Sequence, residues 1–148
     1  RPIEKTKRLP LPTIDLPLPA YIPEEYVSDT NTRLSLYQRL AGLNNTEQIE
    51  DTIKELSDRF GALPQEVKNL LYAVKIKLLA TKAGIESIST EDSQIVLRLF
   101  EGMQFDRRKL EPVLRDGIKL GLTQLRLELK RLGKDWREVL EEALGRVG

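Results

Sequence analysis

The chain has 148 residues, of which 40% are hydrophobic and 32% charged, and its formal net charge is +1. These values are typical of a globular protein with a charged surface and exclude a disordered chain. The sequence contains no cysteine and no histidine, which excludes disulfides, thiol catalysis and the commonest general base and metal ligand. We therefore expect no enzyme activity, no cofactor and no metal site in this chain.

The chain begins at Arg1 and its only methionine is Met103. A translation product normally begins with methionine, so we expect this chain to be a piece of a longer protein. No apolar run approaches the roughly 20 residues that span a bilayer, and we expect no membrane partner. The phosphate-binding, dinucleotide-binding and serine-hydrolase motifs are also absent from the sequence.

Prolines concentrate at the start of the chain: residues 1–23 hold six of the eight. Because proline fixes φ and lacks an N–H donor, this stretch is predicted to be an extended tether with at most a short strand near residues 13–16. The remainder, 24–148, is predicted to form a single regulatory interaction domain.

Three helices are predicted next. Asp29 or Thr30 can cap the first helix. Residues 44–48 are predicted to form a loop with a capping box that starts the second helix, and Gly61 is predicted to end that helix. The third is predicted to run from Pro64 to Gly84. The expected core stripes of the first two helices are Leu34, Tyr37, Leu40 and Ala41, and then Ile49, Ile53, Leu56 and Phe60.

The hydrophobic period changes to two after Gly84. It predicts a strand pair over 85–89 and 95–100, and a second pair over 118–129 with a turn near Gly121. A short helix around 110–114 and an amphipathic helix from Trp136 complete the pattern. The predicted fold class is α+β, with an N-terminal helical layer followed by a small antiparallel sheet with flanking helices.

One face of the second predicted helix is acidic. Its four carboxylates, which we call the acidic ridge, recur at i, i+4, i+8 and i+11 opposite the apolar stripe: Glu47, Asp51, Glu55 and Asp58. Like charges at i, i+4 destabilise a helix slightly, so the ridge is a candidate docking surface for a cationic partner. The alternative is an ordinary solvated face, partly relieved by Lys54 and Arg59, and the residues alone favour it.

Residues 104–137 are net positive, whereas 22–60 are net negative. The basic half suggests an alternative function, an accessory nucleic-acid-binding domain. Only Phe105 and Trp136 could serve there as stacking platforms, so direct nucleic-acid binding is disfavoured against a solvated surface. The residues that would carry it are Arg107, Arg108, Lys130, Arg131 and Lys134.

Segments 14–43 and 55–71 resemble the C-terminal domain of the bacterial transcription-repair-coupling factor. Beyond about residue 90 only the layout of strands and helices is similar. The residues that match the family pattern are Ala20, Ile22, Pro23, Tyr26, Asp29, Asn31, Arg33, Leu34, Tyr37, Arg39, Leu40 and Ala41, then Glu55, Leu56, Asp58, Arg59, Phe60, Gly61 and Pro64.

The resemblance implies that the parent is a large cytoplasmic bacterial DNA translocase acting in transcription-coupled nucleotide excision repair. Such a parent engages DNA, displaces stalled RNA polymerase and recruits the excinuclease A subunit, and its ATPase site belongs to other domains. In that family the C-terminal domain docks onto an N-terminal module resembling the excinuclease B subunit. The docking masks the excinuclease A binding surface, which is an autoinhibitory arrangement. The resemblance assigns the acidic contact to Glu55 and Asp58, and with it the docking interpretation becomes the favoured one.

Overall fold

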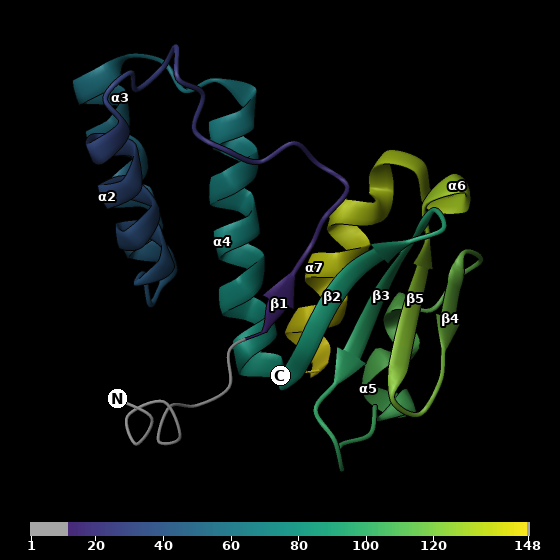
Figure 1. Ribbon diagram of the computed structural model, residues 1–148. Coiled ribbons are helices and arrows are strands. Elements are labelled where there is room, and N and C mark those ends of the chain that lie inside the picture. Colours follow the sequence, from purple (N-terminus) through teal and green to yellow (C-terminus); the bar gives the residue numbers. More distant parts are fainter. Residues whose placement is uncertain (1–11, 148) are drawn as a thin grey trace. The chain divides into compact units, whose positions relative to one another are not determined.

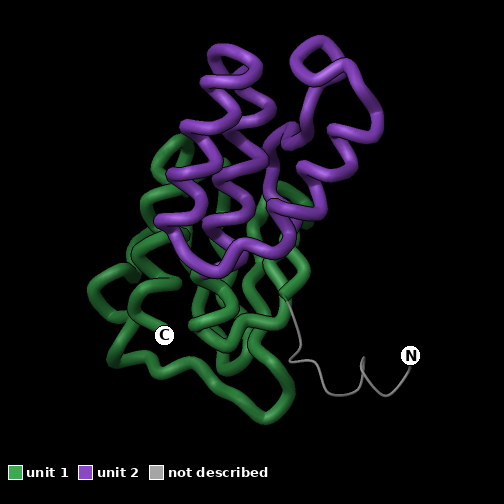
Figure 2. The backbone as a smooth tube through the Cα atoms, turned by 90° about the vertical axis from the view of Figure 1, so that its left-hand side faces the viewer, with its two compact units in different colours: residues 1–14, 79–148 green, residues 15–78 purple. Residues whose placement is uncertain are grey.

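The computed structural model describes residues 12–147, so residues 1–11 of the predicted tether lie outside the described residues. The chain packs as two compact units (Figure 2). One unit is Asp15–Leu78; the other contains strand β1 (Thr13–Ile14) and the residues from Leu79 onward. The predicted treatment of 24–148 as a single domain stays a prediction.

The unit of residues 15–78, purple in Figure 2, is built from three helices, the last of which, α4, continues beyond it. Asn45 starts α3 by accepting a 2.9 Å hydrogen bond from the backbone N–H of Gln48. The Gln48 side chain accepts in return from the N–H of Asn44 at 2.6 Å, which confirms the predicted capping box. The helices are α2 (Thr30–Ala41), α3 (Thr46–Phe60) and α4 (Gln65–Ala83).

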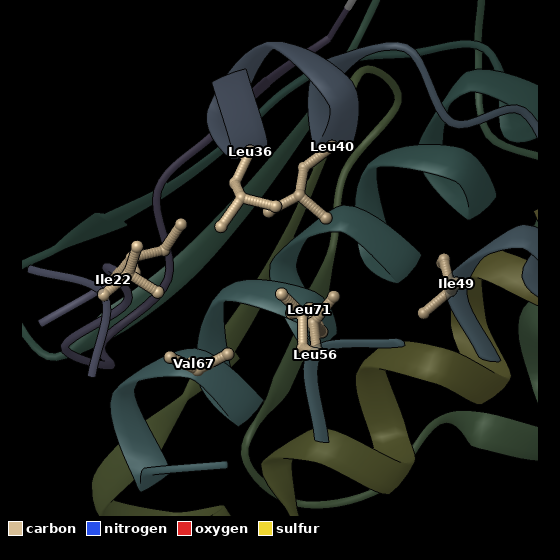
Figure 3. Close-up of a cluster of buried hydrophobic side chains, with 8 residues drawn as sticks. Ile22, Leu36, Leu40, Ile49, Leu56, Val67 and Leu71 are labelled. Carbon is tan, nitrogen blue, oxygen red and sulfur yellow. The ribbon is translucent and has the colours of Figure 1, made fainter. Parts of the chain in front are cut away.

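The buried residues of this unit differ from the core stripes predicted for the first two helices. On α2 the buried residues are Leu36 and Leu40, whereas Leu34 is 56% exposed, because the face that meets the neighbouring helices is rotated from the predicted one. On α3, Ile53 is 38% exposed at the margin of the buried face. The buried cluster (Figure 3) consists of Ile22, Val27, Leu36, Leu40, Ile49, Leu56, Val67 and Leu71.

Three polar contacts fasten residues 19–22 of the extended segment before α2 to the helices. The Asn69 side chain, which is buried, donates to the carbonyl of Pro19 at 2.9 Å. The Tyr37 hydroxyl accepts from the backbone N–H of Ile22 at 2.7 Å. The N–H of Tyr21 donates to the carbonyl of Glu66 at 3.3 Å. Paired backbone groups allow this proline-rich segment to lie against apolar helices.

The other unit, green in Figure 2, holds a five-stranded sheet in the order β1-β2-β3-β5-β4. β1 runs parallel to β2, and the other neighbours are antiparallel. Both predicted strand pairs are confirmed, and the first closes through Asp92 and Ser93, which have φ of 47° and 62°. The strands are β1 (Thr13–Ile14), β2 (Ile85–Glu91), β3 (Gln94–Leu99), β4 (Ile118–Leu120) and β5 (Gln124–Glu128).

Helices cover one face of this sheet (Figure 1). α7 buries Val139, Leu140, Ala143 and Leu144. On the sheet, Ile88, Leu97 and Leu125 lie in register across the strands and are also buried.

The short predicted helix consists of α5 followed by a 3-10 turn that carries Pro112. The fold class is α+β, as predicted. The helices of this unit are α5 (Arg107–Leu110), α6 (Leu129–Leu132) and α7 (Trp136–Val147). None of the described helices is long and apolar enough to cross a bilayer.

Candidate functional site

The acidic ridge lies on α3, opposite its buried side. Ile49, Thr52 and Leu56 face the core. A residue four or seven positions away on a helix shares its face, whereas a residue two positions away lies on the opposite side. The helix therefore turns Glu47, Asp51 and Asp58 away from the core, whereas Glu55, three positions from the buried Thr52, lies at the edge of the buried side. Glu47, Asp51 and Asp58 are exposed, and Glu55 is half-buried.

Glu55 is held by an arginine on the neighbouring helix. Arg39 of α2 donates from Nη1 to Oε2 of Glu55 at 2.6 Å and from Nη2 to Oε1 at 2.5 Å. This two-bonded fork is the geometry that arginine and carboxylate form best. The hydrogen bond from Arg39 lowers the pKa of the Glu55 carboxyl below its usual value, and the same bond raises the pKa of Arg39. Both groups are therefore charged across the physiological range.

A second cation lies close to the same carboxylate. Nη1 of Arg59 is 4.0 Å from Oε2 of Glu55, and its guanidinium lies 4.8 Å from the ring centroid of Phe60. The Phe60 ring in turn lies 5.7 Å from that of Tyr26. The contact with the Phe60 ring gives Arg59 a second partner besides the carboxylate. Glu55 therefore has two cations nearby, Arg39 and Arg59.

The other three ridge carboxylates are not neutralised in this way. Among residues 12–147, the side chains of Glu47, Asp51 and Asp58 take part in no ion pair and no hydrogen bond. Their charge is therefore directed to solvent, where it can attract a cationic surface within about a Debye length. No group of three or more metal-ligating side chains occurs within the described part of the chain. The arrangement suits binding by charge.

Sequence reasoning missed Arg39 as a member of the site. Arg39 and Glu55 are 16 positions apart and lie on different helices. A helical wheel describes one helix and carries no information on the register between two. The sequence offers their opposite charge, which many other pairs share, and their presence in the family pattern, and neither of these shows that the two side chains pair.

An apolar groove lies between α3 and α4 in the same unit. Its volume is about 560 Å³. Ile53, the exposed member of the predicted stripe, lines it together with Leu63 and Leu71. The groove explains why Ile53 can be apolar and yet exposed. The remaining lining residues are Ile49, Ser57, Ala62, Lys68, Tyr72 and Lys75.

The basic residues named for the nucleic-acid alternative lie in the sheet-containing unit. Arg131 pairs with Asp116 at 2.8 Å and approaches Glu128 at 3.8 Å. The other four are exposed: Arg107, Arg108, Lys130 and Lys134. Among the described residues of this unit, no aromatic side chain is exposed, so the structure adds no stacking platform to the basic charge.

The chain thus combines a helical unit carrying an outward acidic face with a sheet-containing unit. A family model for the TRCF domain matches residues 16–110, and the chain belongs to that family. The transcription-repair-coupling factor of Rickettsia bellii (strain RML369-C) is 44% identical over 91 residues, which are 62% of this chain and 8% of that protein. The factor of Escherichia coli (strain K12) is 33% identical over 88 residues, 60% of this chain and 8% of its own length.

A solved structure has the same fold. The crystal structure of the C-terminal domain of a transcription-repair coupling factor aligns with a TM-score of 0.76 at 24% sequence identity. The alignment covers 95% of this chain and 92% of that one. The chain therefore has the fold of this domain along nearly its whole length, although it spans only about a tenth of the curated relatives.

Proposed function

We propose that this chain is a non-catalytic regulatory domain of a transcription-coupled repair translocase in the bacterial cytoplasm. It docks through the acidic ridge onto the excinuclease-B-like module of its parent protein. The docked domain covers the surface that the excinuclease A subunit would otherwise bind. The parent's contacts with RNA polymerase and DNA belong to its other domains.

The observation that supports this proposal is the outward set of unpaired carboxylates on α3. Glu47, Asp51 and Asp58 lie on the face of a helix whose other face is built into the core. A surface of this kind attracts a basic patch and places it in one orientation, because the helix that carries the charges is held by packing. Membership of the TRCF domain family supports the choice of partner, because the resemblance implies an acidic docking contact at Glu55 and Asp58 of this helix.

The mechanism is competition for one surface. While the domain is docked, excinuclease A finds its binding surface covered, and its apparent affinity falls in proportion to the undocked fraction. Each 1.4 kcal/mol of docking free energy reduces that affinity about tenfold. Charge-dominated docking suits a reversible clamp, because modest changes elsewhere in the parent can release it.

Reversing charge on the ridge tests the proposal. Asp51→Arg with Asp58→Arg in the full-length parent should strengthen excinuclease A binding, measured by titration calorimetry or surface plasmon resonance. This pair is preferred to Glu55→Arg with Asp58→Arg, because arginine at 55 would also repel Arg39 and disturb the packing of α2 on α3.

Glu24→Arg with Glu25→Arg is the matched control. Both residues are exposed in the same unit, and the double variant changes the net charge by the same amount away from the ridge. The control should leave excinuclease A binding as in the wild type. Equal binding by all three proteins would contradict ridge docking.

A further inference from the structure

Glu55 differs from the rest of the acidic ridge because its charge is already engaged inside the domain. The two bonds from Arg39 use both carboxylate oxygens, at 2.6 and 2.5 Å. The Arg39 and Glu55 side chains remain 41% and 39% exposed. The pair is therefore a surface contact within reach of a docking partner, and it is not locked in the core.

We propose that Arg39 is an internal competitor for Glu55 and sets the strength of docking at the acidic ridge. A partner cation that approaches Glu55 meets a carboxylate whose charge is already offset by Arg39. Nη1 of Arg59 also lies 4.0 Å from Oε2 of the same carboxylate. The inference rests on the proposed docking function. Arg39 acts through Glu55 and is a positioning residue, not a contact for the partner.

The geometry defines how the competition works. A carboxylate has about four lone-pair sites, so Glu55 can accept a partner donor while it keeps one bond from Arg39. Two like charges are then brought to one carboxylate, and their repulsion reduces the gain from docking. The docked state is destabilised, whereas the undocked state keeps the full ion pair between Arg39 and Glu55. Arg39 therefore keeps docking weak enough to be reversible.

The competition predicts that removing the Arg39 charge strengthens docking. Exposed ion pairs contribute about 0.2–1 kcal/mol, and the upper part of that range, about 0.4–1 kcal/mol, corresponds to a change in Kd of about two- to fivefold at low salt. The assay titrates the 148-residue chain against the purified excinuclease-B-like module of the same parent. Arg39→Gln should bind about two- to fivefold more tightly than the wild type, with the gain shrinking as salt is added.

A double-mutant cycle separates action through Glu55 from a general charge effect. In a Glu55→Gln background, Arg39→Gln should no longer tighten binding, because its partner carboxylate is gone. Lys68→Gln is the control, since it removes one positive charge from an exposed position of the same unit. It should change Kd less than Arg39→Gln does. Thermal melts of each variant show that the binding data come from folded protein.

The outcomes distinguish the two proposals. If the wild-type chain does not bind the module, ridge docking fails and the role of Arg39 falls with it. If the wild type binds and Asp51→Arg with Asp58→Arg weakens binding, docking at the ridge stands. In that case, unchanged or weaker binding by Arg39→Gln overturns the competitor role alone. An equal tightening with and without Glu55 would also overturn it.

Discussion

The hydroxyl of Tyr26 lies 2.8 Å from the carbonyl oxygen of Gly61 and 3.1 Å from that of Leu56. Gly61 is the C-cap residue of α3, and Leu56 lies in the next-to-last turn of that helix, so the Tyr26 hydroxyl lies beside the end of α3. A side chain that precedes α2 therefore closes the end of α3, and it fixes the helix that carries the acidic ridge.

Tyr26→Phe removes this hydroxyl while it keeps the ring beside Phe60. Burial raises the pKa of Tyr26 above its usual value, so the hydroxyl stays protonated at neutral pH and can donate. We expect the free energy of unfolding to fall by about 1 kcal/mol, the typical contribution of one hydrogen bond. Urea titration measures it. Tyr21→Phe is the control, because Tyr21 is 47% exposed and its substitution should have little effect.

Leu56→Ala and Ile53→Ala compare two residues of α3 that look alike in sequence. Leu56 is 2% exposed and Ile53 is 38% exposed. We expect Leu56→Ala to lower the free energy of unfolding by about 2–5 kcal/mol, because it opens a cavity in the core. Ile53→Ala should lower it by about 1 kcal/mol or less, since its side chain borders solvent. Denaturant unfolding measures both, and equal losses would mean that the groove does not border Ile53 in solution.

Asn69→Ala tests the attachment of the extended segment. The variant removes the bond to the carbonyl of Pro19 and leaves that acceptor near apolar side chains, with an expected loss of about 1–3 kcal/mol. Limited proteolysis should then cut residues 16–20 faster than in the wild type. Asn69→Asp keeps the size and the acceptor for Gln65 but removes the donor to Pro19, so it should also be cut faster. Proteolysis at the wild-type rate in both variants would argue against this attachment.

Glu91 provides a pH-dependent prediction in the sheet-containing unit. Hydrogen bonds from Arg98 and from the Ser89 hydroxyl lower the pKa of its carboxyl from 4.5 to about 2. A lowered pKa stabilises the fold above the unfolded value near 4.5, and that stabilisation disappears as the pH falls towards about 2. The stability difference between wild type and Glu91→Gln should therefore be constant above pH 4.5 and shrink below it.

Carboxyl chemical shifts followed by NMR test the same contact directly. In Arg98→Gln the pKa of Glu91 should move back towards 4.5, because the main hydrogen-bond donor is lost. A Glu91 pKa that stays low in this variant would assign the shift to another cause.

The element boundaries follow local signals in the sequence. Asn45 and Gln48 form the capping box expected from their spacing, and Pro64 directly precedes α4. The alternation of Ile95, Leu97 and Leu99 marks β3 correctly. These signals act within a few residues, so a single sequence contains them.

Features that depend on contacts between different helices or strands could not be predicted from the sequence by such local signals. Leu34 and Leu36 are equally apolar, and only the neighbours of α2 decide that Leu36 is the buried one. The fork between Arg39 and Glu55 depends on the register of two helices. The pairing of Thr13 with Ser87 joins residues far apart along the chain. The charge pattern of the ridge was visible in the sequence, whereas its internal counter-charge was not.

Strand β1 has a practical consequence for where a shorter fragment of this chain should begin. Its two residues lie along the outer side of β2 and occupy backbone groups that an exposed edge would offer to another chain. A fragment beginning at Asp15 would keep every helix of the described residues yet leave the β2 edge of the sheet without its neighbouring strand. Such a fragment should associate with itself at high concentration, and a boundary placed ahead of Thr13 avoids that artefact.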